Sequence, residues 1–138
     1  MSTTTQSPAN AVAVAPLRGL VPMAHVADVQ RSIDFYAKLG FRVESTFAPG
    51  GQLSWAWLHS GQAHLMVTRS ARPMNPDAQD VLFYLYARDV VECRRQLAAQ
   101  GIPVGPLSYP FYMKAGEFRV TDPDGYCLLI GEGDADSM

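Results

Sequence analysis

The chain has 138 residues, a net charge of −2 at pH 7 and an apolar content of 48%. This length suits one domain with a sizeable core and is too short for two independent domains of ordinary size. The 11 basic residues are scattered, without the basic stripe that phosphate backbones require, so nucleic acid is not an expected partner. No apolar run approaches the roughly 20 residues of a membrane span. We therefore expect no membrane contact and a cytoplasmic location.

The two ends of the chain differ in composition from its middle. Residues 1–18 are rich in Ser, Thr, Ala and Pro and have no sustained periodicity, which predicts a mobile tail. Residues 134–138 are expected to form a second, short tail. A single domain is therefore predicted over residues 19–133.

The first half of this domain, about residues 19–71, is predicted to form a βαβββ module. The apolar run from Leu20 to Ala27 predicts a strand, and Asp28 is expected to cap a helix that ends at Gly40. Apolar residues three or four apart make one face of this helix: Val29, Ile33, Tyr36 and Ala37. Three further strands follow, separated by Gly-containing turns: Phe41–Phe47, Leu53–His59 and Gln62–Thr68.

A linker with many turn-forming residues, 72–77, leads to a second module over about residues 80–133. Val81–Ala87 predicts its first strand, and Asp89 is expected to cap its helix, with Glu92 completing a capping-box pattern. The buried face of this helix, which ends at Gly101, is predicted from its apolar spacing: Val90, Cys93 and Leu97. The closing strands are predicted around Val104 and over Glu117–Thr121 and Tyr126–Ile130, the last two joined by the turn Asp122–Gly125. The Pro and aromatic content of residues 103–116 favours a loop as much as a strand.

The two modules follow one pattern, in which a strand leads into Asp-Val, then an amphipathic helix, then Gly and an apolar residue. This pattern predicts an internal duplication, and a duplicated small sheet indicates a site shared between the halves. Residues 26–41 and 118–126 resemble the vicinal oxygen chelate superfamily, the group of glyoxalases, bleomycin-resistance proteins and extradiol dioxygenases. The resemblance extends over roughly residues 20–132. It implies an α+β fold of two tandem βαβββ modules, forming a curled, cup-shaped mixed sheet with helices on the outside. One fold hosts many sites, so the resemblance alone leaves the function open.

Enzymes of that superfamily hold a divalent metal in the cup through His, Glu or Gln side chains. The equivalent positions, counted from the helix caps and turn glycines, are apolar here: Val21, Leu65, Leu82 and Leu129. Apolar side chains cannot bind a hard or borderline cation, so we expect no metal and no other cofactor. A slip of one residue would turn His64 into the cup in place of Leu65, because it exchanges the two faces of a strand. One histidine alone makes no metal site.

Aromatic residues are the main remaining signal. Trp55 and Trp57 share one strand face, and Tyr84 and Tyr86 share another. In the arrangement that the resemblance implies, these rings and His25 line one cavity, suited to a planar or cationic ligand. Two alternatives stay open: the tryptophans form core under a helix, or His25 bonds only a neighbouring polar group.

Charged residues and a loop complete the candidate site. Glu117 and Arg119 alternate with apolar residues and are expected at the cavity or its rim, unless they only form an exposed salt bridge. Phe111, Tyr112 and Met113 concentrate large side chains in a loop, which predicts a lid or cavity wall. Their alternative is packing under the linker or against a second subunit. The resemblance implies a homodimer, in which the cavity can be built between subunits.

These features favour a metal-free protein of the bleomycin-resistance type that sequesters an aromatic or cationic organic compound. The net charge of −2 argues against a strongly cationic antibiotic such as bleomycin itself. The alternative is a metal-dependent or cofactor-free lyase, isomerase or dioxygenase, with His25 or Glu117 as base. A third hypothesis is an interaction module whose cup is empty. Turnover of a bound compound separates the enzyme from the binding protein.

Overall fold

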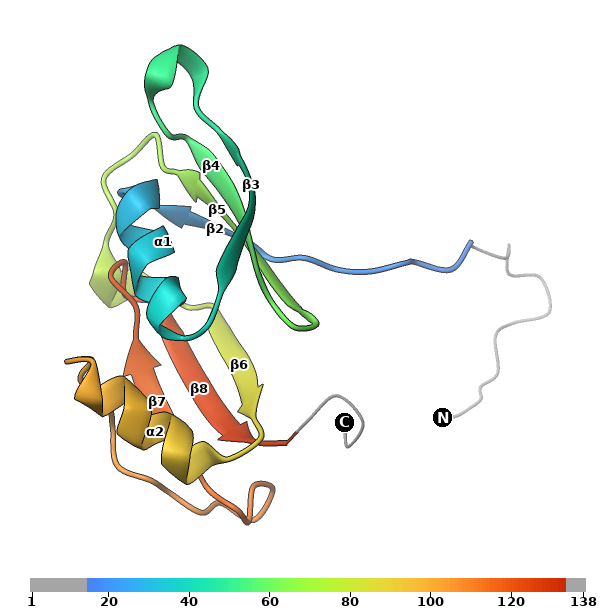
Figure 1. Ribbon diagram of the computed structural model, residues 1–138, viewed down its shortest axis with the longest axis vertical. Helices are drawn as coiled ribbons and strands as arrows, with labels where there is room; N and C mark the ends of the chain where they lie inside the picture. Colours follow the sequence, from blue (N-terminus) through green and yellow to red (C-terminus); the bar gives the residue numbers. More distant parts are fainter. Residues whose placement is uncertain (1–14, 134–138) are drawn as a thin grey trace.

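The computed structural model describes residues 15–133. Two modules follow one another along the long axis of the molecule (Figure 1). The predicted tail 134–138, and residues 1–14 of the predicted N-terminal tail, lie outside the described residues. Residues 15–22 form no regular structure, and Figure 1 shows them running away from the body of the protein as an extended segment.

The first module is a four-stranded sheet with one helix, and the second is a three-stranded sheet with one helix. In the first sheet the strand order is β2-β5-β4-β3, and in the second it is β6-β8-β7. In each module the first strand pairs in parallel with the last, and the other pairs are antiparallel. The elements are β2 (Met23–Val26), α1 (Val29–Lys38), β3 (Arg42–Phe47), β4 (Trp55–Ser60), β5 (Ala63–Arg69), β6 (Leu82–Ala87), α2 (Val90–Ala99), β7 (Glu117–Thr121) and β8 (Cys127–Glu132). The tandem α+β architecture predicted from the sequence is therefore confirmed.

Both helices begin at the predicted caps. The Asp28 and Asp89 side chains each accept a hydrogen bond, at 3.1 Å, from the backbone N–H three residues later, which satisfies a donor that the first helical turn leaves unpaired. The predicted capping box at α2 is only half formed. The Glu92 carboxylate accepts from Arg95 and Gln96 in the following turn, because these charged and amide partners lie on the same side of the helix.

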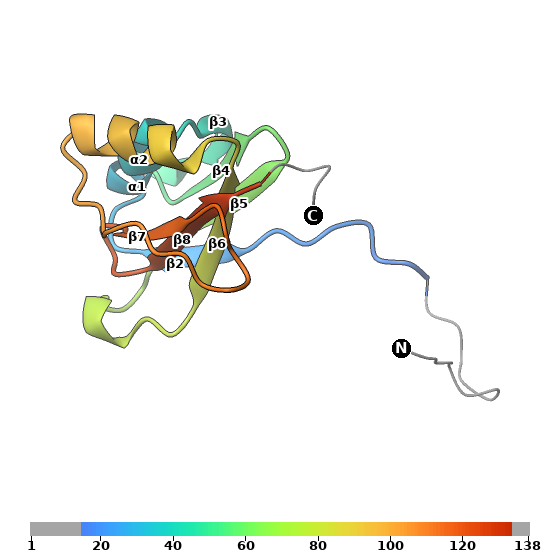
Figure 2. The ribbon, with the colours of Figure 1, turned by 90° about the horizontal axis from the view of Figure 1, so that it is seen from below.

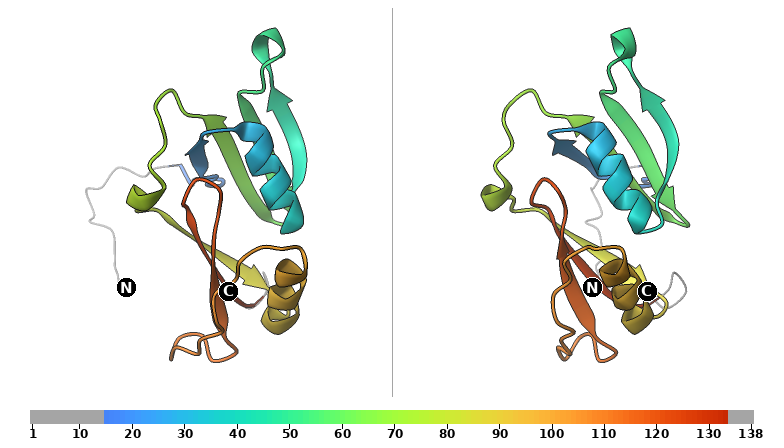
Figure 3. Two further views of the ribbon diagram at one scale, coloured as in Figure 1. Left: turned by 90° about the vertical axis from the view of Figure 1, so that its left-hand side faces the viewer. Right: turned by 60° about the vertical axis from the view of Figure 1, so that its left-hand side comes forward.

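The helices cover one side of the two sheets, as Figure 2 shows. The strand residues that face them are buried and apolar: Ala24, Val26, Ala56, Leu58, Leu65, Val67, Phe118, Val120, Leu128 and Ile130. On α1, Ser32 is buried and Ala37 is exposed, so Ser32 takes the place in the buried face that was predicted for Ala37. The two helices lie next to each other (Figure 3), and Gln100 Nε2 donates to Lys38 O at 2.9 Å between their C-terminal ends. No helix within residues 15–133 is long and apolar enough to span a bilayer.

The strand predicted around Val104 is not formed. Residues 103–116 run beside β7 with only local pairing: Gly105 N donates to Arg119 O (2.9 Å), and Ser108 exchanges two backbone hydrogen bonds with Glu117 (both 2.9 Å). Prolines at positions 103, 106 and 110 carry no backbone N–H, so they cannot continue a ladder of strand hydrogen bonds. This segment is therefore free to fold over the sheet as a loop.

The turn Asp122–Gly125 of the second module docks on α1 of the first and on the residue before its cap. Asp122 Oδ2 accepts from the hydroxyl of Tyr36 at 2.7 Å. Asp124 Oδ1 accepts from Ala27 N at 2.8 Å and from Arg31 Nη2 at 3.0 Å. Burial raises the pKa of Asp122, although the Tyr36 hydrogen bond opposes that shift. A network of buried carboxylates therefore joins the two modules.

Candidate ligand-binding site

Each sheet has a second face that the helices do not cover. On the first sheet this face carries His25, Thr68 and Trp55 in one row, and Met23, Met66 and Trp57 in the next; we call these six residues the tryptophan face. The two indole rings meet edge to face, with centroids 6.5 Å apart. Ala56, between them in the strand, is completely buried. The predicted shared face is thus confirmed, and it points away from the helix, so the tryptophans are not core residues beneath α1.

Histidines also lie on this side of the first sheet. Trp57 Nε1 donates to His64 Nδ1 at 3.0 Å, which leaves the proton of a neutral His64 on Nε2. Leu65, which the count of ligand positions placed in the cup, is only 5% exposed on the helix side. The open face of β5 therefore carries His64 instead. The His25 side chain makes no hydrogen bond with another residue of the described range, although its backbone carbonyl accepts from Tyr126.

No group of three or more His, Cys, Asp or Glu side chains within residues 15–133 is arranged to hold a metal ion. Two of the counted ligand positions, Leu82 and Leu129, do lie on the open face of the second sheet, since Leu129 pairs with Tyr84. Their side chains offer no donor atom.

The open face of the second sheet carries stacked tyrosines. The Tyr84 and Tyr86 rings are nearly parallel, at 22°, with centroids 5.3 Å apart. Glu117 and Arg119 project from β7 on the same face. Glu117 pairs with Gly131 of β8, which pairs with Tyr86, and Arg119 pairs with Leu129, which pairs with Tyr84. We call these side chains, with Tyr112 of the neighbouring loop, the tyrosine face.

Glu117 is buried within the tyrosine face, with 5% of its surface exposed. Its Oε1 accepts a hydrogen bond from the Tyr84 hydroxyl, and its Oε2 accepts one from Tyr112 at 3.3 Å. Burial, together with the adjacent Glu117 carboxylate, raises the pKa of both tyrosines. Both phenols therefore keep their protons at neutral pH and remain donors. The ion pairs found among the described residues do not include Glu117, so the predicted alternative of a salt bridge with Arg119 is not formed.

The loop 109–116 is held against the tyrosine face by Met113. A Cβ added at Gly131 would lie 2.6 Å from Met113 Cε, so the methionine occupies the space that the glycine leaves open. Phe111 and Tyr112 remain exposed and pack edge to face, with centroids 5.4 Å apart. The predicted loop residues thus lie at one end of the tyrosine face, and Met113 anchors them there.

The tryptophan and tyrosine faces belong to different sheets, in the upper and lower modules of Figure 1. Within one chain, Tyr84, Tyr86, Tyr112 and Glu117 come together, while the tryptophans and His25 lie apart from them on the first sheet.

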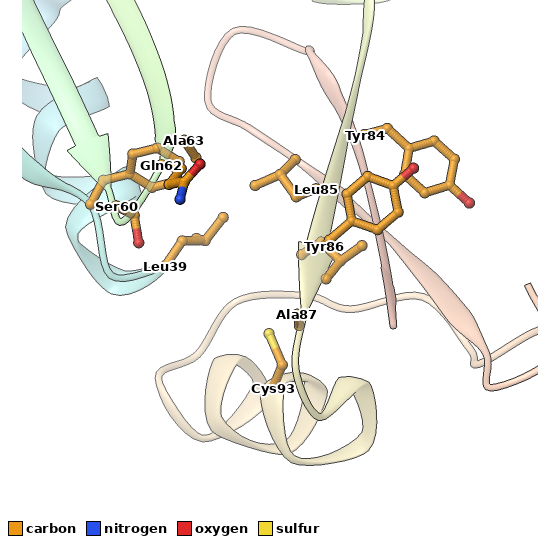
Figure 4. A pocket seen from close by; sticks show the side chains of 11 residues that line it. Leu39, Ser60, Gln62, Ala63, Tyr84, Leu85, Tyr86, Ala87 and Cys93 are labelled. Carbon is orange, nitrogen blue, oxygen red and sulfur yellow. The ribbon is translucent and has the colours of Figure 1, made fainter. Parts of the chain in front are cut away.

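A groove of about 560 Å³ lies between the modules, and its lining includes neither tryptophan nor His25. In Figure 4, Leu39 and Gln62 of the first module face Leu85 across this groove, whereas the rings of Tyr84 and Tyr86 point to the other side of β6. Sequence reasoning missed this groove. The sequence feature that could have indicated the groove is the alternation along β6, which places the apolar Leu85 and Ala87 on the face opposite the two tyrosines.

The profile of the Glyoxalase/Bleomycin resistance protein/Dioxygenase superfamily matches residues 21–130, which include both modules. No curated protein sequence matches the chain.

Solved structures with the same fold include three that differ in their described roles. The bleomycin resistance determinant encoded on transposon Tn5 has a TM-score of 0.72 and 21% identity, over 86% of this chain and 99% of that one. The bleomycin-binding protein of Streptomyces verticillus, complexed with copper(II)-bleomycin, has a TM-score of 0.66 and 20% identity, over 88% and 100%. A glyoxalase family protein from Enterococcus faecalis has a TM-score of 0.65 and 23% identity, over 85% and 97%. At these identities the likeness concerns the fold.

Proposed function

We propose that this protein, which belongs to the Glyoxalase/Bleomycin resistance protein/Dioxygenase superfamily, captures an aromatic or cationic organic compound without the help of a metal. The observation that carries the proposal is the pair of open sheet faces, each with two aromatic rings side by side. Rings that pack only a core would face the helices, and these do not. Flat ring faces bind planar or cationic ligands through stacking and cation–π contacts, in addition to the burial of apolar area.

The two faces are half-sites in our proposal. Each is one layer of side chains on a sheet, whereas a small-molecule site normally encloses most of its ligand. We propose that two copies associate so that the tryptophan face of one opposes the tyrosine face of the other. Such a homodimer has two equivalent sites, and it covers the exposed apolar side chains of Met23 and Phe47.

Two further observations support organic capture. The S. verticillus neighbour is described as a complex with copper(II)-bleomycin, so this fold can hold a large organic compound in another protein. In this chain the ligand-equivalent positions Leu82 and Leu129 are apolar, which favours contact with an organic ligand over direct coordination of a metal.

The proposal is tested with Trp55→Ala and Trp57→Ala. Binding of a planar probe, 2-naphthylmethanol, is measured by calorimetry for both variants and the parent protein. Loss of one stacking ring removes about 1 kcal/mol or more, so each variant should bind the probe at least about fivefold more weakly. Val91→Ala, on the exposed surface of α2, is the matched control. Unchanged affinity in both tryptophan variants would remove the stacking mechanism.

Recovery of the bound probe separates capture from catalysis. A capture protein returns the compound unaltered after release, whereas an enzyme with Glu117 or His25 as base converts a true substrate. Chromatography of the released compound after long incubation measures this directly, and a new product would replace the capture proposal with the enzymatic alternative.

A further inference from the structure

Glu117 lies on the tyrosine face, hydrogen-bonded to both Tyr84 and Tyr112. Its carboxylate is nearly removed from solvent, and each of its two oxygens accepts a hydrogen from a phenol. An ionised carboxylate suits this arrangement, because both of its oxygens act only as acceptors. Phenols are neutral donors, so they solvate the charge without cancelling it.

A buried charge is ordinarily paired with an opposite charge, because transfer from water to the protein interior costs several kcal/mol per ion. None of the ion pairs among residues 15–133 supplies a cation to Glu117. Arg119 shares the open face, two residues along β7, but it is exposed to solvent. The two side chains form no ion pair, and the surrounding water weakens the attraction of the exposed guanidinium for the carboxylate.

The surroundings of Glu117 suit a cation. The stacked rings of Tyr84 and Tyr86 lie on one side, and Tyr86 is 45% exposed, so a ligand can reach it. On the other side, the exposed Tyr112 packs edge to face with Phe111. The electron-rich faces of such rings attract ammonium and amidinium groups.

We infer that the tyrosine face is a subsite for a positively charged nitrogen of the ligand, with Glu117 as its counter-ion. The nitrogen donates to Glu117 Oε2 and displaces Tyr112, whose 3.3 Å hydrogen bond is long. Tyr84 stays on Oε1 and holds the carboxylate in place. This inference rests on the proposed function and narrows the ligand to an aromatic compound that also carries an amine, amidine or guanidine.

The test compares two probes of the same shape, 2-naphthylmethylammonium and the neutral 2-naphthylmethanol, by calorimetry with the full chain. The parent protein should bind the cation more tightly, by on the order of tenfold. Glu117→Gln keeps the size of the side chain and one acceptor for Tyr84, but it removes the charge. This variant should lose the preference for the cation and keep its affinity for the alcohol.

Asp34→Asn is the matched control, because it removes one negative charge from an exposed position on α1, on the side of the first sheet away from the open faces. It should leave the preference for the cation unchanged. If Asp34→Asn lowers that preference as much as Glu117→Gln does, the effect is general electrostatics and the inference is wrong. Tyr112→Phe frees Oε2 and should bind the cation at least as tightly as the parent protein does. A tenfold weaker affinity for the cation in Tyr112→Phe would contradict the proposed displacement.

The outcomes separate the two proposals. Equal binding of both probes by the parent protein would overturn the cationic subsite and leave organic capture standing. Binding of neither probe would count against both. Should Glu117→Gln fail to fold, the comparison of the two probes on the parent protein and on Tyr112→Phe still decides the matter.

Discussion

Tyr36→Phe probes the carboxylate network that joins the modules. Tyr36 is 1% exposed, and its hydroxyl donates to Asp122 Oδ2 at 2.7 Å. The ring also packs edge to face against Phe35 and Phe41, and phenylalanine keeps those contacts. The substitution therefore removes one hydrogen bond to a buried carboxylate and changes almost nothing else.

The size of the effect follows from the charge of the acceptor. A hydrogen bond to a charged group contributes roughly 1.5–3 kcal/mol, whereas a neutral one contributes about 1 kcal/mol. At neutral pH we therefore expect the free energy of unfolding to fall by about 2–3 kcal/mol. This is a large part of the roughly 5–15 kcal/mol that stabilises an ordinary domain.

The loss should also depend on pH. Burial raises the pKa of Asp122 and the Tyr36 hydrogen bond lowers it, so Tyr36→Phe raises this pKa further. A carboxyl whose folded-state pKa is raised binds more protons in the folded state, and stability falls as pH rises through that pKa. The deficit of Tyr36→Phe relative to the parent protein should be smallest near pH 4 and largest near about pH 8.

Urea unfolding followed by tryptophan fluorescence, at several values of pH, measures this deficit. Tyr126→Phe is the matched control, because its hydroxyl donates at 2.9 Å to the neutral backbone carbonyl of His25. Its cost should be about 1 kcal/mol, with less dependence on pH. The reasoning is refuted if Tyr36→Phe costs no more than Tyr126→Phe, or if its deficit does not grow with pH.

Two further predictions concern the backbone and metal binding. Gly125→Ala should destabilise by more than about 2 kcal/mol, because Gly125 has φ +90° and an added Cβ would lie 2.3 Å from Pro76 O. Gly61 has φ +57° and open space around it, so Gly61→Ala should lower the free energy of unfolding by only about 1 kcal/mol. Thermal unfolding compares the two variants, and equal losses of stability would contradict the close approach at Pro76. Titration of the untagged protein with nickel, zinc, manganese and iron(II), the last under anaerobic conditions, should show no stoichiometric high-affinity binding; tight binding that is lost in His25→Ala or His64→Ala would establish a metal site.

Local pattern in the sequence was sufficient for the modules and their faces. Asp28 and Asp89 cap helices because a short side-chain acceptor at that position satisfies the first free N–H groups. Trp55 and Trp57, or Tyr84 and Tyr86, share a face because a strand alternates its side chains with period two. These relations extend over four residues or fewer, so the chain specifies them without reference to the rest of the fold.

The competition for Glu92 shows where such patterns fail. The S/T/D-x-x-E spacing predicts a capping box, but Arg95 and Gln96 one turn later bind the same carboxylate. The strand predicted around Val104 is absent for a different reason. Three prolines in residues 103–116 prevent a regular strand, so the conformation of this loop depends on tertiary contacts such as that of Met113 with Gly131.

By itself, the sequence determined the two tandem modules, the βαβββ order of the first, the helix caps of both and the side on which each aromatic pair lies. Only the tertiary structure decided which distant groups meet: Asp122 with Tyr36, Glu117 with Tyr84, and Leu39 with Leu85 across the groove. The burial of Glu117 was decided in the same way, since it depends on where a loop and two strands pack together. The physical reason is that capping and alternation are set by the geometry of a few consecutive residues, whereas burial and long-range hydrogen bonds depend on the packing of the whole chain.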